Sequence, residues 1–518
     1  MELQCDVCII GAGFAGGLIA EKMAEHCDKI IMFERGNDYI RPPENVHPWS
    51  TARESSTGQP FITNTGSIRY LYDMRFGTGG SLVTWGGICF RMHASDFRMK
   101  SLYGLADDWP IDYDDIEPYY CDIEEEVGVA GVPDHNFSYR SRPFPMDGFP
   151  LSHADKVVRE IFEPQGFSMS HLPQARNSVE YRGRPACCGA QSCVEYCPVD
   201  ARYRPDTTHI KWALAKGNVE LRKDSVICRL ETGEDGRITK VHGKKPDGSS
   251  FTVKAKIYAL CANTVENTRL LLLSRNNTFP NGLANSSGML GKYFFSTGGA
   301  AIMGFIRKSR QPNRGPLSTG IVTDWVDGPF RKYRPAAVFE VWNPGFYPEY
   351  YSQRFIQFGF FGKELKDKLK KFYGVDFECT MPFDCLPYES NSITLNEHAV
   401  DQFGMNAANV HFDFTEYELK GAQFIVRTLE KVMTQAGGFV VHTGEHGLNG
   451  NHPMGTYRMG KNSKTSVVTD KLQAHDHKNL FVFGGGAHIT GGAVNPSMTI
   501  GALTLRALPH FLETYRGL

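Results

Sequence analysis

The sequence lacks an excess of basic charge. Lys and Arg together number 56 against 57 for Asp and Glu, which leaves a formal net charge of -1 over 518 residues. Because binding to a phosphodiester backbone needs a surplus of positive side chains, this balance argues against nucleic acid as a partner. Hydrophobic residues make up 41% and charged residues 22%, the usage of ordinary globular proteins. Collagen, coiled-coil and intrinsically disordered chains are therefore excluded.

Long hydrophobic runs are missing as well. No apolar stretch approaches the roughly 18 to 20 residues that span a bilayer, so we expect no membrane span in this chain. The N-terminus enters a strand-like segment at once, without the charged and apolar leader of a signal peptide. We therefore expect a cytoplasmic location by sequence, and a place on the periplasmic side of the inner membrane only through export together with a partner subunit.

The N-terminal residues hold a dinucleotide-binding pattern. A short apolar run over residues 5–10 is followed by Gly11-Ala12-Gly13-Phe14-Ala15-Gly16 and a helical segment, and a second strand over 29–33 ends at Glu34. This order places a pyrophosphate on the N-terminus of the helix and a ribose beside the carboxylate of Glu34. The pattern fits NAD and FAD equally. A pyridine-nucleotide flavoprotein reductase would carry a second glycine fingerprint, and the sequence contains none.

Two motifs near the C-terminus point to the chemistry. The first is Asn451-His452-Pro453-Met454-Gly455-Thr456, and the second is Val494-Asn495-Pro496-Ser497, with the strand-like run 480–483 between them. At these residues the sequence resembles the glucose-methanol-choline (GMC) oxidoreductases, which are FAD enzymes that oxidise alcohols. The resemblance implies FAD as the cofactor, with His452 and Asn495 as catalytic residues that face N5 of the flavin.

Alcohol oxidation explains why such a pair is needed. Moving a hydride from an alcohol carbon to a flavin requires the hydroxyl proton to leave too, so a base with a pKa near neutrality should contact the oxygen. We expect His452 to be this base. Asn495 can bond to the same oxygen without competing for its proton. The helix after Pro496 would direct its positive end toward the anionic edge of the reduced flavin.

Further cofactor contacts follow from the same resemblance. The run Gly77-Thr78-Gly79-Gly80-Ser81 corresponds to the family segment beside the isoalloxazine and the pyrophosphate. Val226 lies in a predicted strand over 225–230, where the family backbone meets adenine. Residues 259–273 resemble a second family signature, a strand that turns into a helix under the cofactor. The expected FAD contacts are Gly11, Gly13, Phe14, Ala15, Gly16, Glu34, Gly79, Gly80, Ser81, Val226, Gly485, Gly486, Ala487, Pro496 and Ser497.

The cysteines are unevenly distributed. Of the 13 cysteines, Cys187, Cys188, Cys193 and Cys197 lie together in one short loop that ends in Cys-Pro, and the others are scattered through apolar or mixed segments. A structural zinc site usually draws on two separated pairs of ligands, whereas a short loop that closes with Cys-Pro is typical of iron-sulfur ligation. The loop therefore favours an iron-sulfur cluster over zinc or free thiols.

This loop narrows the resemblance to one branch of the family. Its form, CC-x4-C-x3-CP, is similar to that of the catalytic subunits of bacterial FAD-dependent glucose, fructose and sorbitol dehydrogenases. The resemblance implies a 3Fe-4S cluster held by Cys187, Cys193 and Cys197, a small helper subunit and a cytochrome-type electron acceptor. It also implies a small polar polyhydroxy substrate, a sugar or polyol. Residues 288–296 depart from this branch and residues from about 300 to 440 are least similar, so the identity of the substrate stays open.

We expect an α/β fold (α+β overall) of GMC type, with a Rossmann-type FAD-binding domain and a second domain built on an antiparallel sheet. The predicted divisions are a discontinuous FAD-binding domain over 1–140, 198–295 and 440–518, a cluster-bearing insertion over 141–197, and a substrate-binding cap over 296–439. Inside the cap, strand-like alternation covers 336–342 and 354–361. A helix is predicted over 419–435, and the charged run 363–371 predicts a solvated helix face.

The main hypothesis is an FAD-dependent dehydrogenase that passes electrons from a sugar or polyol through the cluster to a carrier. A second is an alcohol oxidase or dehydrogenase for another polyhydroxy compound, such as an aminoglycoside precursor, in which the cluster is structural. A third is an electron-transfer or binding subunit without catalysis, which leaves His452 and Asn495 unexplained. Covalent attachment of FAD, a ligand role for Cys188 and the oligomeric state stay open.

Overall fold

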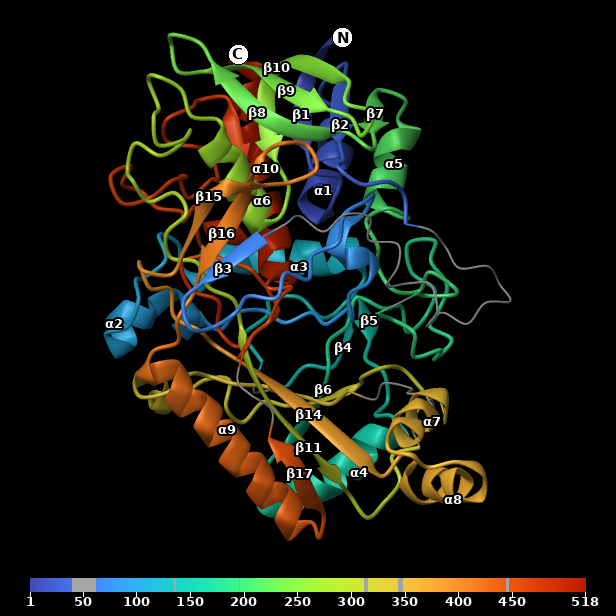
Figure 1. Cartoon of the computed structure of the whole chain (residues 1–518). Helices are drawn as coiled ribbons and strands as arrows, with labels where there is room; N and C mark the ends of the chain where they lie inside the picture. Colours follow the sequence, from blue (N-terminus) through green and yellow to red (C-terminus); the bar gives the residue numbers. More distant parts are fainter. Residues whose placement is uncertain (40–61, 135–136, 195, 312–314, 343–347, 444–446) are drawn as a thin grey trace.

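The computed structural model describes residues 1–518 except 40–61, 135–136, 195, 312–314, 343–347 and 444–446. Figure 1 shows two sheet-based regions, one above the other. The upper region carries both chain termini. The lower region is a smaller sheet flanked by helices, and segments from several parts of the sequence run between the two.

The upper region contains a mixed sheet. Its strands are β1 (Glu2–Ile10), β2 (Ile30–Phe33), β7 (Val219–Arg222), β8 (Val226–Thr232), β9 (Ile238–Lys244), β10 (Ser250–Leu260) and β19 (Leu480–Val482). The order is β7-β2-β1-β10-β9-β8, with β19 paired to β10. Pairing is parallel except in the β10-β9-β8 ribbon. The central strand β1 buries Val7, Cys8 and Ile9 completely, as expected for a parallel strand covered on both faces.

Helices pack on this sheet and on one another. They are α1 (Phe14–Met23), α3 (Tyr113–Val127), α5 (His209–Ala215), α6 (Thr264–Leu273) and α10 (Ser497–Arg516), and a shorter helix, α2 (Met99–Tyr103), precedes α3. The C-terminal helix α10 packs against α1 and α3. Gly501 permits this contact, because a Cβ there would lie 2.5 Å from Ile123 and 2.9 Å from Phe14. The packing brings the start of α10 to the turn that follows β1.

The lower region contains an antiparallel sheet. Its strands are β11 (Gly298–Phe305), β14 (Asp376–Phe383), β17 (Phe439–Thr443) and β18 (Gly447–Leu448), and its helices are α4 (His153–Phe162) and α9 (Glu416–Gln435). α9 packs against β11 and confirms the helix predicted over 419–435. It begins at Glu416 because Thr415 and Glu418 form a capping box. Its buried face includes Ile425 and Leu429, which join the apolar core of the lower region.

Smaller sheets join the two regions. Their strands are β3 (Ile62–Thr65), β6 (Met169–His171), β12 (Gly320–Val322), β13 (Phe339–Glu340), β15 (Ser392–Val400) and β16 (Asn406–His411), with β4 (Ala130–Gly131) paired to β5 (Met146–Asp147). β16 pairs with β15 and β3, and β12 pairs with β13 and β6. Residues of the predicted insertion therefore share a sheet with the predicted cap. The division into domains stays a prediction.

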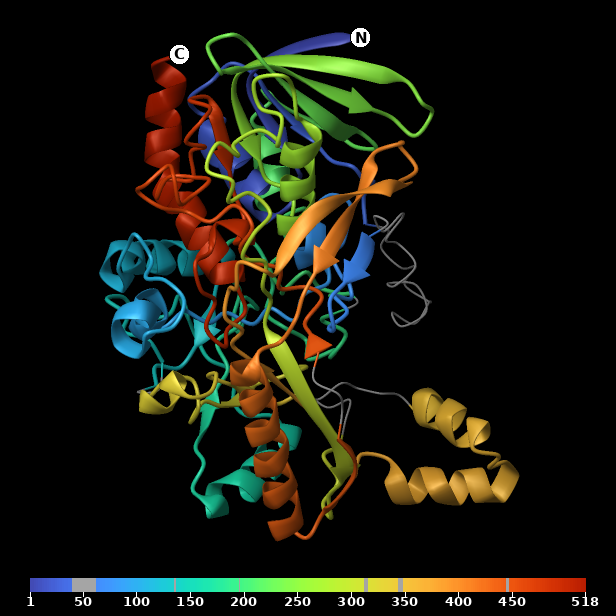
Figure 2. The same cartoon turned by 60° about the vertical axis from the view of Figure 1, so that its left-hand side comes forward.

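One predicted strand is wrong. The alternation over 354–361 predicts a strand, but the structure has α7 (Pro348–Gln357) followed by a turn and then α8 (Gly362–Phe372). The alternation misleads because the apolar side chains are not packed on a sheet, and Phe358 and Phe361 are 74% and 63% exposed. Figure 2 shows both helices extending from the side of the lower region. α8 buries none of its residues, which agrees with the solvated helix face predicted there.

The architecture confirms the predicted α/β class, since a largely parallel sheet with helices is accompanied by a separate antiparallel sheet. One large apolar core surrounds β1, β10 and α10, and another surrounds β11, β14 and α9. Among the residues with a described position, no helix is both long and apolar enough to cross a bilayer.

Candidate active site

The glycines of the turn after β1 have three different surroundings. Gly11 has a φ of +108°, and a Cβ there would lie 2.6 Å from the carbonyl carbon of Cys261. A Cβ on Gly16 would lie 2.2 Å from the oxygen of Gly11, so a glycine is needed for α1 to pack closely. A Cβ on Gly13 would meet no described atom within 4 Å. These are the three roles of glycine in a dinucleotide turn: a tight turn, close packing of the helix, and open space for the pyrophosphate.

Glu34 lies next to this turn, at the end of β2, and is 6% exposed. Its Oε2 accepts a hydrogen bond from the backbone N–H of Ala12 at 3.1 Å, and its Oε1 accepts from those of Gly36 and Gly77, each at 2.9 Å. Burial raises the pKa of the carboxyl, and these N–H groups oppose the shift. The carboxylate joins three backbone segments, and Oε2 retains a second acceptor position that a ribose hydroxyl can use.

A cavity extends from this turn to the start of α10. It contains about 1290 Å³ of space not filled by protein atoms, part of it open to solvent. The predicted cofactor residues on its wall are Gly11, Gly13, Phe14, Ala15, Glu34, Gly80, Ser81, Val226, Gly485, Pro496 and Ser497. Segments from both ends of the sequence therefore meet around one cavity.

The other predicted cofactor residues lie behind the residues that line the cavity. The backbone N–H of Gly79 donates a hydrogen bond to the carbonyl oxygen of Ala12 at 2.7 Å. This bond holds the glycine-rich run 77–81 against the turn 11–16. A Cβ on Gly486 would lie 2.0 Å from an aromatic ring, and Ala487 is completely buried. Together with Gly16, these residues shape the backbone and do not line the cavity.

His452 and Asn495 lie next to each other. The side-chain nitrogen of Asn495 is 3.3 Å from Nε2 of His452. On the other side of the ring, Nδ1 lies 2.9 Å from the hydroxyl of Thr297 and 3.2 Å from the side-chain nitrogen of Asn449. A neutral imidazole carries one N–H, and an amide nitrogen can only donate. The Asn495 contact alone favours a lone pair on Nε2, and the Asn449 contact alone favours one on Nδ1, so these two contacts do not select a tautomer. The hydroxyl of Thr297 suits either, because it can accept from Nδ1–H or donate to an Nδ1 without a proton.

Burial lowers the pKa of His452 to about 4. The near-neutral pKa expected from the sequence is therefore wrong for this structure. Protein atoms surround the ring, and its hydrogen-bond partners are a hydroxyl and amides, which do not stabilise an imidazolium as a carboxylate would. The imidazole is neutral at pH 7, so one of its two ring nitrogens carries a lone pair that can accept a proton.

The helix α10 begins at the same place. Pro496 is its N-cap residue, and Pro496, Ser497 and Ile500 all line the cavity. The first N–H groups of a helix lack partners inside the helix and carry partial positive charge. α10 therefore directs its positive end toward the cavity, where it favours an anionic group.

Sequence reasoning missed Glu340, a carboxyl group beside the His452 and Asn495 pair. Glu340 is 5% exposed, and its Oε2 accepts a hydrogen bond from Nε1 of Trp342 at 2.9 Å. Burial raises its pKa to about 7, and the nearby side chains of Trp342 and Asn495 oppose this shift. The available signal was an acidic residue inside the apolar run 336–342. Thr297 was also missed, and no motif around it marks a role.

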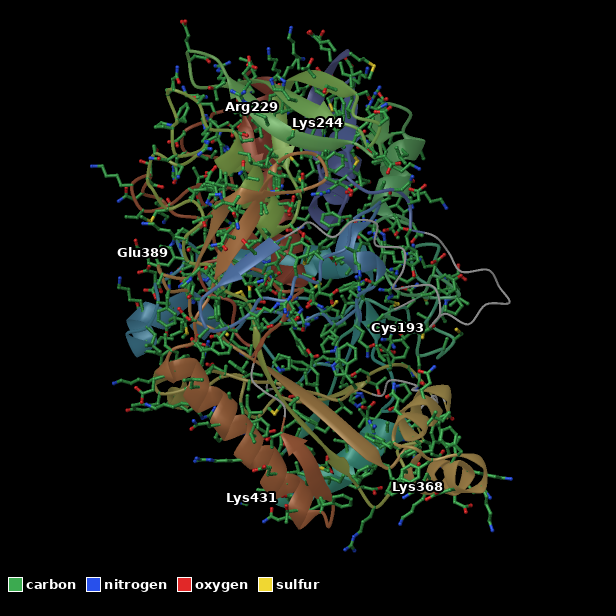
Figure 3. All side chains as sticks on the ribbon, in the orientation of Figure 1. Cys193, Arg229, Lys244, Lys368, Glu389 and Lys431 are labelled. Carbon is green, nitrogen blue, oxygen red and sulfur yellow. The ribbon has the colours of Figure 1, made fainter. Side chains whose placement is uncertain are left out.

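The cysteine loop lies at mid-height on the flank of the molecule, where Figure 3 labels Cys193. Cys193 and Cys197 are 7% and 6% exposed, Cys187 is partly buried and Cys188 is exposed. Burial raises the pKa of Cys187, and Cys193 and Cys197 raise it further, so the three predicted ligands are neighbours. Across the described ranges, no three His, Cys, Asp or Glu side chains take up a metal-ligand arrangement.

Three buried arginines lie around this loop. Arg176, Arg184 and Arg202 are 1%, 5% and 0% exposed. Burial lowers the pKa of Arg202 to about 10, while Cys193 and Cys197 raise it. Within the described part of the chain, the hydrogen bonds of these guanidinium groups all go to backbone carbonyl oxygens, and the three Nε atoms have no partner.

Two other buried arginines of the described residues are neutralised by carboxylates. Arg331 forms ion pairs with Asp96 and Asp384, and Arg269 forms one with Asp401. The three arginines at the cysteine loop have no such ion pair with any residue whose position is described. Since a buried charge needs a counter-charge, their surroundings fit an anionic group bound at the loop.

Comparison with known proteins agrees with this geometry. Residues 387–504, which include both C-terminal motifs, match the family described as GMC oxidoreductase. The chain is 30% identical to the fructose dehydrogenase large subunit of Gluconobacter japonicus, over 99% of this chain and 98% of that protein. It is 28% identical to the 2-methyl-1,2-propanediol dehydrogenase of Mycolicibacterium austroafricanum, over 97% of this chain and 94% of that protein.

The fold is shared with solved structures. Pyridoxine 4-oxidase from Mesorbium loti superimposes with a TM-score of 0.67 at 17% sequence identity, and the alignment covers 99% of each chain. The chain belongs to the GMC oxidoreductase family and is an FAD-dependent oxidoreductase that acts on CH-OH groups.

Proposed function

We propose that this enzyme oxidises a hydroxyl group of a sugar or polyol and passes the electrons through an iron-sulfur cluster to a partner protein. The observation that carries the oxidation is the contact of Asn495 with Nε2 of His452 at 3.3 Å, next to a segment that lines the cofactor cavity. Two relatives, a fructose dehydrogenase subunit and a 2-methyl-1,2-propanediol dehydrogenase, support a polyhydroxy substrate.

The cavity residues fit FAD. The open space at Gly13 and the N–H groups of α1 suit the pyrophosphate, Oε2 of Glu34 suits a ribose hydroxyl, and Val226 suits the adenine end. The start of α10 at Ser497 suits the flavin end, because its positive dipole favours added negative charge. When bound, FAD supplies a hydride acceptor, the N5 atom of the flavin.

His452 accepts the proton that the alcohol releases. Oxidation of an alcohol removes a hydride from the carbon and a proton from the oxygen, and the product is a carbonyl group. Nε2 of His452 accepts this proton in the tautomer that carries its own proton on Nδ1 and donates a hydrogen bond from Nδ1–H to Thr297. The amide of Asn495 positions the same oxygen through a hydrogen bond. Both side chains are held in place before substrate arrives, which lowers the entropic cost of reaching the reactive geometry.

The arginines around the cysteine loop support the cluster part of this proposal. Cys187, Cys193 and Cys197 would hold a 3Fe-4S cluster, whose net negative charge the guanidinium groups of the loop would offset. When bound, such a cluster supplies single-electron transfer, which suits a cytochrome-type acceptor. A small helper subunit belongs to the same proposal, since the relative from Gluconobacter japonicus is named as a large subunit. Export with that subunit would bring the enzyme to the periplasmic side of the inner membrane.

Two measurements test the proposed function. Denatured protein should release FAD, and a screen of sugars and polyols should find one that reduces the bound flavin without oxygen and supports turnover with an artificial electron acceptor. Release of NAD, or a flavin that no hydroxyl compound reduces, would contradict the proposal. Turnover with oxygen as fast as with the artificial acceptor would favour the second hypothesis, an oxidase with a structural cluster.

A further inference from the structure

The proton transfer described above does not use Glu340. This residue ends β13, and the residues two positions before and after it, Val338 and Trp342, pack on the apolar core of the upper region. The residues next to it, Phe339 and Val341, pack on the core of the lower region. Because side chains alternate along a strand, Glu340 points with Val338 and Trp342 toward the upper region, which contains the cofactor cavity.

Burying a carboxyl group in this position costs free energy. Glu340 is 5% exposed, and its neighbours on the same face of the strand are apolar. Nε1 of Trp342 satisfies Oε2, whereas Oε1 is buried and has no hydrogen-bond partner among the described residues. An unsatisfied buried acceptor costs free energy that an apolar residue of similar size would avoid. The carboxyl therefore requires a reason beyond packing.

Asn495 presents a second unsatisfied oxygen. Its side-chain nitrogen faces Nε2 of His452, and its amide lies close enough to Glu340 to lower the pKa of that carboxyl. Its Oδ1 is buried and, like Oε1 of Glu340, lacks a partner in the described part of the chain. The two oxygens belong to side chains that contact each other, beside the nitrogen that takes the substrate proton. When Glu340 is ionised, both oxygens can only accept, so a ligand that satisfies them must bring a hydrogen-bond donor other than the hydroxyl that is oxidised.

We propose that Glu340 and Asn495 accept a hydrogen bond from the hydroxyl on the carbon next to the one that is oxidised, so that the enzyme selects compounds with two neighbouring hydroxyl groups. This inference rests on the proposed oxidation at His452. Trp342 keeps the carboxyl in position, and its indole lies against Gly86, where a Cβ would be 3.3 Å from the ring. A simple alcohol leaves both oxygens unsatisfied, which corresponds to a loss of about 10- to 100-fold.

The test compares alcohols that differ in this second hydroxyl. The probes are 1,2-propanediol and 1-propanol, together with the polyol that reduces the flavin fastest and its analogue without the neighbouring hydroxyl. Flavin reduction is measured without oxygen in the holoenzyme, and binding is measured by calorimetry on enzyme reduced beforehand with dithionite, where no turnover occurs. We expect the compound with neighbouring hydroxyls to be preferred by about 10- to 100-fold in each pair that reacts or binds.

Variants assign this preference to the carboxyl. Glu340→Leu should reduce the preference at least about tenfold by weakening only the compound with neighbouring hydroxyls, and Glu340→Gln, which keeps the shape, should do so to a smaller degree. Asp155→Asn is the matched control, because Asp155 is a buried carboxyl with a raised pKa that bonds to Ser152 and Thr319 instead. It should keep the wild-type preference.

The outcomes separate this inference from the proposed function. Wild-type enzyme without any preference, or an unchanged preference in Glu340→Leu and Glu340→Gln at full FAD content, would overturn the inference and leave alcohol oxidation intact. A wild-type flavin that no hydroxyl compound reduces would overturn the proposed function as well. If Glu340→Leu does not fold, Glu340→Gln and the wild-type comparison decide.

Discussion

Arg202 connects the cysteine loop to the segment beside the cofactor cavity, because its guanidinium donates a hydrogen bond to the carbonyl oxygen of Trp85 at 2.5 Å. Cys193 and Cys197 lie near the same guanidinium and raise its pKa against the effect of burial. Leu82, three residues before Trp85, lines the cavity. One fully buried side chain therefore bridges the two places where we propose FAD and the iron-sulfur cluster.

Replacing Arg202 should change the reduction potential of the cluster. Reduction adds negative charge, which a buried guanidinium stabilises, so Arg202→Met should make the potential more negative. Arg202→Lys keeps the positive charge and should give a smaller change. The measurement is a redox titration followed by electron paramagnetic resonance, with iron content determined on each sample. Identical potentials in all three proteins would show that the arginine does not act on the cluster.

Replacing Cys193 should remove the cluster and spare the oxidation of substrate. Cys193→Ser should lower iron from about three atoms per chain, stop electron transfer to a cytochrome acceptor, and leave flavin reduction by the polyol nearly unchanged. The matched control is Cys188→Ser, because Cys188 is exposed and outside the proposed ligand set. Iron analysis and stopped-flow absorbance check these outcomes. Full iron content in Cys193→Ser would remove this residue from the ligand set.

A side chain at Gly13 should block FAD and leave the fold intact. A Cβ there meets no described atom within 4 Å, and the φ of -98° is accessible to any residue, so the space is free for the ligand alone. We expect Gly13→Val to fold with little or no FAD. Gly16→Val should instead destabilise the protein, because its Cβ would lie 2.2 Å from the oxygen of Gly11. Circular dichroism and the absorbance of released flavin distinguish the two. Normal FAD content in Gly13→Val would place the pyrophosphate elsewhere.

Buried histidines should make the protein less stable at acid pH. Burial lowers the pKa of His488 from 6.5 to about 3. Below about pH 6.5 the unfolded chain binds a proton at this residue and the folded chain does not, so its contribution to stability is present above pH 6.5 and is lost as the pH falls.

This effect can be isolated by replacing His488. Between pH 7 and pH 5, wild-type protein should lose about 2 kcal/mol more of its free energy of unfolding than His488→Leu, because the variant has no group to protonate there. Urea unfolding at the two pH values measures the difference. An equal loss in both proteins would mean that His488 titrates normally.

The sequence predicts the parts that local patterns determine. The glycine turn and Glu34 follow from the order of strand, turn and helix, and α9 follows from its apolar spacing and the capping box at Thr415. The contact between His452 and Asn495 was expected from the family resemblance alone. Local sequence patterns and the family resemblance were sufficient to predict these features.

Other parts depend on contacts that no local pattern encodes. Glu340 and Thr297 lie far from the C-terminal motifs in the sequence, and only tertiary packing brings Glu340 to Asn495 and Thr297 to His452. The arginines at the cysteine loop look like ordinary surface residues in the sequence, and their burial appears only in the structure. The strand predicted over 354–361 was wrong for the same reason, because alternation indicates a strand only where a sheet is present to pack against.

The central claim is that His452 takes the proton of the alcohol while FAD is reduced. The most direct test is the rate of flavin reduction by the best polyol, measured without oxygen in wild-type enzyme and in His452→Ala at equal FAD content. We predict that the variant reduces its flavin about 10² to 10⁴ times more slowly, because the hydroxyl proton has no acceptor at Nε2. An equal rate in the two proteins would contradict the claim and place the base at another residue.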